Sequence, residues 1–383
     1  MGRGERRPSL HIVNFAFSEE QEELRRYARQ WLGERMPLER VRELMRTPDG
    51  FDRADWSAIA ELGWQAMAVP EEYGGAGFGL LEVAVLLEEQ GRAMYCGPFL
   101  STVVGAANAI LLAGSEAQKS EILGRVAAGE IVVALAVTED GGRFDGEHMR
   151  TSAVADDGGW IIDGTKRYVI DGNTADLLVV AAQTADGVGL FVVDGNAEGV
   201  RRTPLPTMDE TRKQTDVAFS KVAVGEGARL AHGDASTLRR VNEVLAVALA
   251  LEQVGGAQAT LDMAVQYAKD RQQFGKPIGS FQAVKHMCAD MLVSVESARA
   301  AAYYAAWTVA EGNDEAATVV PLAKAYCSDA FLECAAANIQ VHGGIGFTWE
   351  HDAHLYFKRA KSSQLMLGTP AEHRRQLAER LGF

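Results

Sequence analysis

The sequence has few cysteines and no pattern that would use them together. Its 383 residues include four cysteines that lie far apart or at helical spacing, and no CxxC pair is present. This spacing excludes a disulfide framework and is typical of a chain that works in a reducing cytosol. We expect each of them to be a small buried hydrophobe: Cys96, Cys288, Cys327 and Cys334.

Positive charge and long apolar runs are also scarce. The 38 basic residues against 52 acidic ones give a net charge of −14, and no block of lysine and arginine stands out. This balance disfavours an electrostatic nucleic-acid or anionic-membrane partner. No uninterrupted run reaches the ~20 apolar residues of a membrane span, and the basic N-terminus lacks the apolar stretch of a signal peptide. We therefore expect a cytoplasmic protein without membrane insertion.

The residues that are present predict three regions. Length and an apolar content of 47% allow two or three domains with sizeable cores. Residues 1–129 show helical spacing, with capping boxes at Ser18 and Ser115 and a glycine-rich loop over 69–79.

The periodicity changes from 3.6 to 2 between residues 130 and 232. Five β-branched runs are separated by turn residues: 131–137, 159–170, 176–182, 188–194 and 216–224. Asp163-Gly164 is the strongest hairpin signal. Since no helical segments intervene, we expect an antiparallel sandwich or barrel.

Residues 233–383 return to long helical patterns with few glycines. A buried stripe that includes Phe281, Cys288 and Val295, together with alanine-rich stretches, predicts a helical bundle. The expected fold is α+β and mostly helical: helices, a β domain, then a bundle.

Two segments of the bundle region carry candidate binding chemistry. In the first, Arg271 precedes Phe274 and Gly275, so a guanidinium and a flat ring stand at a helix end, where they suit a phosphate and a ring system. A helix-capping arginine and a packed phenylalanine explain that segment equally well. In the second, Gly343 and Gly344 allow close approach of backbone to a pyrophosphate, or simply end a helix.

Taken together, these segments resemble the acyl-CoA dehydrogenase flavoprotein family over essentially the whole chain. The resemblance rests on PEEYGG, on Val137-Thr138-Glu139, on R-x-x-F-G followed by F-Q, on Q-x-x-G-G-x-G and on the closing LGTPAEHRR. It implies an N-terminal helical domain, a central antiparallel β domain and a C-terminal four-helix bundle, assembled as a dimer of dimers. It also implies FAD bound across a dimer interface, an acyl-CoA substrate oxidised at its Cα–Cβ bond, and an electron acceptor such as an electron-transfer flavoprotein.

The resemblance divides the FAD-binding positions into two halves. The half that reaches the neighbouring chain matches the family, and consists of Arg271, Phe274, Gln282, Gln340, Gly343 and Gly344. The half that holds the flavin ring in its own chain, at Thr138, Tyr168 and Thr369, is altered. Asp140 to Asp145 replaces the family's P-x-A-G-S-D, and Ile170 has no hydroxyl to bond the flavin.

The largest departure concerns the catalytic base. Family members place a glutamate either where this chain has Leu367 or where it has Leu245. Glu252 is the better remaining candidate, because it faces the same side of the helix as Leu245 about 10 Å farther along, whereas Glu243 faces roughly the opposite side. A structural salt bridge explains Glu252 more simply than catalysis does, because proton abstraction requires contact at ~3 Å.

These departures favour a subunit that completes the FAD site together with a homologous, base-bearing dehydrogenase chain. Two other hypotheses stay open. One is a self-sufficient homotetrameric dehydrogenase that uses Glu252 or a displaced Glu243, and the other is a catalytically silent homologue that binds FAD or acyl-CoA. The heteromeric members from actinobacterial steroid side-chain breakdown suggest a substrate by analogy alone.

Overall fold

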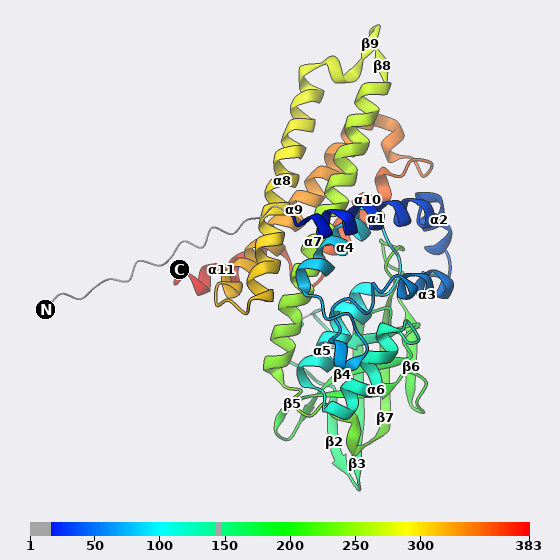
Figure 1. Ribbon diagram of the computed structural model, residues 1–383, viewed down its shortest axis with the longest axis vertical. Helices are drawn as coiled ribbons and strands as arrows, with labels where there is room; N and C mark the ends of the chain where they lie inside the picture. The colour runs from blue at the N-terminus through cyan, green and yellow to red at the C-terminus, as the bar shows by residue number, and fades with distance from the viewer. Residues whose placement is uncertain (1–16, 143, 145–147) are drawn as a thin grey trace, which may run out of the picture.

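The structure is a computed structural model that describes residues 17–142, 144 and 148–383. The basic N-terminal segment, Arg143 and Asp145 lie outside the described residues. Figure 1 shows the β region at one end of the molecule and the hairpin of β8 (Gln272–Gln273) and β9 (Lys276–Pro277) at the other, joined by the long helix α7 (Ala235–Asp270).

Short helices make up the N-terminal region. They are α1 (Glu19–Arg35), α2 (Leu38–Leu44), α3 (Arg53–Glu61), η1 (Glu71–Tyr73), α4 (Leu80–Arg92), η2 (Phe99–Ala106), α5 (Ala107–Ala113) and α6 (Glu116–Ala127). Both predicted capping boxes are confirmed, at Ser18 with Gln21 and at Ser115 with Gln118. The segment 99–113 consists of the fully buried π-helix η2 followed by the α-helix α5.

The central sheet contains β1 (Val133–Ala136), β2 (Ser152–Asp156), β3 (Gly159–Ile170), β4 (Leu177–Thr184), β5 (Gly187–Asp194), β6 (Val200–Pro204) and β7 (Gln214–Gly225). Most pairs are antiparallel, but β1 pairs with β4 in parallel, so the sheet is mixed rather than purely antiparallel. Sequence periodicity alone missed the short strands β2 and β6.

The predicted hairpin at Asp163-Gly164 is wrong. Both residues lie inside β3, where the register with β7 shifts between Ile162 and Gly164. Gly164 has φ +144°, and a Cβ there would lie 2.6 Å from Thr151 Cα, so the position requires glycine for a bulge and not for a turn.

The C-terminal region is the expected helical bundle. Its elements are α7 (Ala235–Asp270), β8 (Gln272–Gln273), β9 (Lys276–Pro277), η4 (Ile278–Ser280), α8 (Gln282–Ala310), α9 (Ala316–His342), η5 (Gly343–Phe347), α10 (Ala353–Leu365) and α11 (Pro370–Arg380). Within the described part of the chain, α7 alone is long and apolar enough to cross a membrane, and 83% of its apolar window is buried in the protein. It therefore packs as the central helix of the fold.

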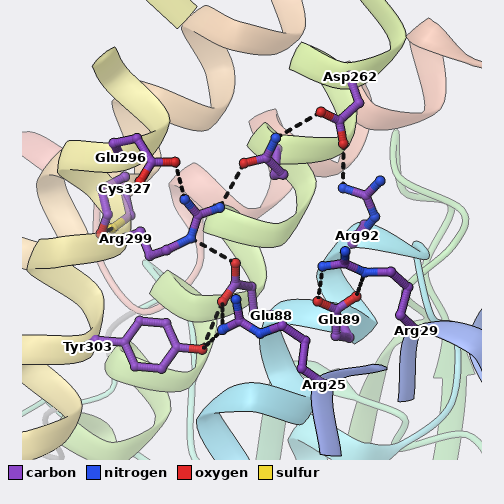
Figure 2. A network of polar contacts seen from close by, with 12 residues as sticks. Arg25, Arg29, Glu88, Glu89, Arg92, Asp262, Glu296, Arg299, Tyr303 and Cys327 are labelled. Carbon is purple, nitrogen blue, oxygen red and sulfur yellow. Dashed lines mark hydrogen bonds and ion pairs between the residues drawn. The ribbon is translucent and has the colours of Figure 1, made fainter. Parts of the chain in front are cut away.

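A buried polar network fastens the N-terminal helices to the bundle (Figure 2). Glu88 on α4 accepts hydrogen bonds from Arg25 at 3.1 Å, Tyr303 at 2.8 Å and Arg299 at 3.0 Å. Glu89 forms a bidentate pair with Arg29. Because removing one member of a buried ion pair strands the other charge, this network fixes how the regions sit against each other.

Three of the four cysteines are buried and Cys288 is partly exposed, and all four are free thiols. Burial raises the pKa of Cys96, Cys327 and Cys334 to about 12, as expected of inert thiols in the core.

Candidate functional site

A cavity of about 610 Å³ lies where the β region, η2, α7 and the end of α10 meet. We call it the main cavity. Aliphatic side chains make most of its wall: Leu100, Leu135, Ile170, Leu245, Leu365, Met366 and Leu367. A few polar groups interrupt them: Ser101, Thr138, Thr207, Asp209, Gln214 and Ser362. A mostly apolar wall with few polar groups is typical of a small-molecule or cofactor site.

Both positions expected to carry a catalytic base face this cavity. Leu245 comes from α7 and Leu367 from the turn after α10. The two positions that the family resemblance identified are thus distant in the sequence but lie on the same cavity wall. Neither side chain accepts a proton. The part of the wall where the family places its base is therefore aliphatic.

Hydrogen bonds from two buried side chains fix the turn that carries Leu367. Leu367 has φ +57°, in the left-handed region that non-glycine residues rarely adopt. His373 Nε2 donates to the Leu367 carbonyl at 2.9 Å, and the buried Lys324 ammonium donates to the carbonyls of Ser363 at 3.2 Å and Gly368 at 3.4 Å. Burial lowers the pKa of Lys324 to about 8. These contacts direct the side chain at position 367 into the cavity.

Glu252 lies away from the main cavity wall, buried against Arg212 in an ion pair. Burial works against a charge at Arg212, but the attraction of Glu252 outweighs it and raises the pKa of the guanidinium. Glu243 lines a neighbouring cavity of about 400 Å³, which we call the side cavity. Burial raises the pKa of Glu243, against the effect of nearby arginines.

The two cavities adjoin, because Phe144, Leu365 and Leu367 line both. Thr369 lies in the side cavity, where its hydroxyl caps α11 in a capping box with Glu372. The side cavity also contains Arg239, Arg375 and Arg380. It is thus the more polar of the two spaces.

The structure adds a buried acidic pair that the sequence did not single out. Asp171 accepts a hydrogen bond from Ser101 Oγ at 2.5 Å. Burial raises the pKa of Asp171 to about 6. Asp209, which lines the main cavity, pairs with Arg359 at 3.0 Å, whereas Asp171 reaches the cavity only through its contact with Ser101. No motif marks these residues, because η2, the end of β3 and α10 are far apart in sequence.

Two of the expected flavin-ring positions, Thr138 and Tyr168, line the main cavity on the side formed by the β region, whereas Thr369 lies in the side cavity. Tyr168, with φ +58°, is half exposed, and Ile170 presents only carbon atoms. Thr138 Oγ1 donates to the Arg167 carbonyl, so its hydroxyl is already bonded within the chain.

A buried ion pair fixes the segment that carries Thr138. Lys166 Nζ donates to Glu139 at 2.7 Å and to the Val137 carbonyl at 3.1 Å. Burial alone would raise the pKa of Glu139, but bonds from Lys166 and two backbone amides lower it to about 2. The segment therefore holds its shape with the carboxylate ionised.

The neighbour-directed positions gather at the other end of the bundle. We call the exposed residues there the bundle-tip surface: Arg271, Phe274, Gln282, Gln340, Gly343, Gly344, Phe347 and Trp349. Phe274 is 91% exposed and Phe347 81% exposed. Gly343 has φ +65°, and a Cβ on it or on Gly344 would meet nothing within 4 Å, which leaves the backbone open to close approach.

These two sets of residues differ in the chemical groups that they offer to a ligand. The main cavity offers a flat aromatic residue, neutral polar groups and apolar walls, which suit an uncharged ring system. Arg271 and the glycines suit phosphates. Leu245 and Arg271, the C-cap of α7, lie 26 residues apart and are therefore separated by about 39 Å along the helix.

Comparison with known proteins identifies the family of the chain. Residues 18–130 match the family described as acyl-CoA dehydrogenase, N-terminal domain, residues 134–222 the middle domain and residues 241–382 the C-terminal domain. The acyl-CoA dehydrogenase IpdE2 of Mycolicibacterium smegmatis is 36% identical over 94% of this chain and 98% of its own length.

Two solved structures share the whole fold. One chain of the ChsE4-ChsE5 complex from Mycobacterium tuberculosis superimposes with a TM-score of 0.89 and 29% identity, over 96% of this chain and 99% of that one. A protein described as an FAD-dependent dehydrogenase superimposes with a TM-score of 0.87 and 29% identity, over 97% of this chain and 100% of that one.

Proposed function

This chain belongs to the acyl-CoA dehydrogenase family, and we propose that it acts as one subunit of a heteromer, completing an FAD site with a homologous chain that carries the base. As a family member it is an FAD-dependent oxidoreductase that acts on a CH–CH bond of an acyl-CoA thioester. The proposal concerns the division of labour between two chains.

One observation carries the proposal: both base positions lie on the wall of the same cavity, and both are leucine. General base catalysis contributes about 10²- to 10⁴-fold and requires a proton acceptor in contact with the substrate. In the described chain, the one carboxylate on that wall, Asp209, is tied to Arg359. A partner chain would have to supply the base.

The bundle-tip surface supports the other half of the proposal. An exposed phenylalanine beside an exposed arginine contributes little to the stability of an isolated chain. Both side chains would make favourable contacts once a nucleotide and a second chain cover them. Arg271 would then bind a phosphate through charge-assisted hydrogen bonds. The open backbone at Gly343 and Gly344 would let the pyrophosphate approach closely.

Within such a heteromer this chain's residues would bind and position, and would not move the α proton. Bound FAD supplies the acceptor for the hydride that leaves the β carbon. The bundle-tip residues would hold the partner's cofactor by its phosphates. The leucines of the main cavity would exclude water, and Lys324 and His373 would keep the 367 turn in place.

The structurally similar ChsE4-ChsE5 complex contains two differently named chains, which is consistent with heteromeric assembly. Under the same proposal the protein is a dimer of dimers, works in the cytoplasm and passes electrons to an acceptor such as an electron-transfer flavoprotein. The acyl group of its substrate stays open within this proposal.

The decisive experiment removes the phosphate contact from the assembled complex. Arg271→Ala is expected to loosen FAD by roughly ten- to a hundredfold, because a hydrogen bond to a charged group contributes about 1.5 to 3 kcal/mol. Arg26→Ala, which removes an exposed arginine from α1, is the matched control. Unchanged FAD retention in Arg271→Ala would contradict the cross-chain assignment.

A second measurement separates the heteromer from the alternatives. The purified chain alone is expected to show no reduction of flavin by acyl-CoA, and co-production with its base-bearing partner is expected to restore it. Flavin reduction by the chain alone would favour a self-sufficient enzyme. A complex that binds FAD or acyl-CoA and never turns over would favour the silent homologue.

A further inference from the structure

The main cavity contains one hydrogen-bonding group whose capacity is only partly used. Ser101 lies on the cavity wall, and its hydroxyl has one proton to give and two lone pairs to offer. Asp171 Oδ2 lies 2.5 Å from Ser101 Oγ and the Pro98 carbonyl lies 3.1 Å from it. Both neighbours are acceptors when Asp171 is ionised, so the lone pairs of the serine have no donor among the described residues.

The charge on Asp171 decides which way the Ser101 proton points. An ionised Asp171 takes the serine proton, so that the hydroxyl can only accept from a ligand. A protonated Asp171 donates to Ser101 Oγ, which frees the serine proton for the Pro98 carbonyl or for a ligand. The pair therefore presents an acceptor to the cavity in one form and a donor in the other.

We propose that the Ser101–Asp171 pair is a ligand contact of the main cavity, and that it selects acyl groups carrying a hydroxyl over the same groups carrying hydrogen or a ketone. The inference rests on the proposed function, since it takes the ligand of the cavity to be an acyl thioester. It adds the chemical class of that acyl group.

The surrounding charges keep Asp171 free for this role. Arg212, on the segment before β7, is paired with Glu252 of α7, and Arg359 of α10 is paired with Asp209. The nearest cations thus already have carboxylate partners.

The remaining neighbours of Asp171 leave it without a counterion. Tyr95, from the turn before η2, is fully buried and its pKa is raised well above its usual range, so it stays neutral. The backbone carbonyl of Lys213 accepts a hydrogen bond from the backbone amide of Asp171. The Lys213 ammonium donates instead to the Met45 carbonyl at 2.6 Å. Burial accordingly raises the pKa of Asp171 to about 6, although the Ser101 hydrogen bond and the two arginines act in the other direction.

At pH 7.5 the ionised form dominates, and Ser101 accepts. A ligand hydroxyl can donate to it, whereas a ketone oxygen would face another acceptor. Because the rest of the wall near Ser101 is aliphatic, with Leu100 and Gly105 beside it, a hydroxyl elsewhere on the ligand has no such partner on η2. The contact is therefore local and specific.

The test measures binding by the full chain with no turnover required. Cyclohexanecarboxyl-CoA is compared with its 3-hydroxy, 4-hydroxy and 4-oxo derivatives by titration calorimetry at pH 7.5 and pH 5.5. At pH 7.5 at least one hydroxylated thioester is expected to bind about two- to tenfold tighter than the parent, the range of one net hydrogen bond, and the oxo derivative is not. At pH 5.5 the oxo derivative is expected to gain affinity.

Three variants assign the effect to the pair. Ser101→Ala is expected to abolish the hydroxyl preference, and Asp171→Asn to make it independent of pH, since asparagine also tolerates the left-handed backbone at this position. Ser362→Ala is the matched control, because it removes another serine hydroxyl from the same cavity. It is expected to leave the preference unchanged.

The proposal is overturned if no hydroxylated thioester binds more tightly than the parent, or if Ser362→Ala removes the preference as fully as Ser101→Ala does. Circular dichroism of each variant distinguishes loss of the contact from loss of folding. Failure here leaves FAD retention in Arg271→Ala untouched, whereas failure of the heteromer proposal appears in FAD retention and turnover.

Discussion

The main cavity and the bundle-tip surface differ in what they keep. In the cavity, Lys324 and His373 hold Leu367 in its left-handed backbone conformation, but neither of the two base positions carries a carboxylate. The bundle-tip surface keeps polar and aromatic groups and lacks any covering. The main cavity is enclosed but has no base at the two family positions, whereas the binding groups of the bundle-tip surface are exposed. Under the proposed function, the two regions would complete each other between chains.

Restoring the base is the most direct way to break this comparison. Leu367→Glu places a carboxylate on a turn that is already directed into the cavity, and is expected to increase exchange of the α proton of a bound acyl-CoA by about 10²- to 10⁴-fold. Deuterium incorporation followed by mass spectrometry measures this rate. Leu367→Gln has the same size without the basicity and serves as the control. No gain over that control would mean that the changes at Tyr168, Ile170 and Asp140 have dismantled the site as well.

Removing Glu252 tests whether the buried charges beside the cavity are structural. Glu252→Gln leaves Arg212 buried without its ion-pair partner, and is expected to lower the free energy of unfolding by about 3 to 5 kcal/mol. Urea denaturation measures this loss. Turnover of the folded heteromer is expected to stay within a few-fold, because no proton passes through this residue. A stable variant with turnover reduced by about 10²-fold or more would instead identify Glu252 as the base.

The pKa of Asp171, the buried partner of Ser101, predicts how the stability of the protein depends on pH. Its pKa is raised by burial, so the folded chain binds a proton more tightly than the unfolded chain does. That contribution to stability is complete only below the ordinary pKa of 3.8 and is lost as the pH rises through about 6. Relative to Asp171→Asn, the wild type is expected to lose on the order of 3 kcal/mol between these limits. Unfolding curves of both proteins from pH 4 to pH 7.5 measure the difference, and parallel curves would contradict it.

The smallest effect is expected at the bundle tip of the isolated chain. Phe274 is 91% exposed, so Phe274→Ser is expected to change the free energy of unfolding by less than about 0.5 kcal/mol. In the assembled complex the same change is expected to weaken both FAD retention and association, because the ring would be covered there. Analytical ultracentrifugation at several concentrations tests this. Equal assembly of variant and wild type would show that Phe274 lies outside the interface.

The sequence by itself determined the order of the elements, and its resemblance to the family predicted a division of the FAD-binding positions. Capping residues such as Ser18 act within one turn, and the alternation of buried and partly buried residues in the first half of β7 follows the two-residue period of a strand, so both are local signals. Local signals failed where the partner strand decides the outcome. Asp163-Gly164 has the composition of a turn, but pairing of β3 with β7 makes it a bulge.

Only the tertiary structure decided which side chains share a space. Leu245 and Leu367 are more than a hundred positions apart, and packing of α7 against the end of α10 places them on one wall. Helical periodicity placed Glu252 on the same side as Leu245, but periodicity could not show that Arg212, from the β region, occupies that side and neutralises the carboxylate. The Ser101–Asp171 contact likewise joins a π-helix to a strand end. Sequence encodes each residue's chemistry and local conformation, whereas proximity between distant residues, and the burial that shifts their pKa values, arises only when the chain packs.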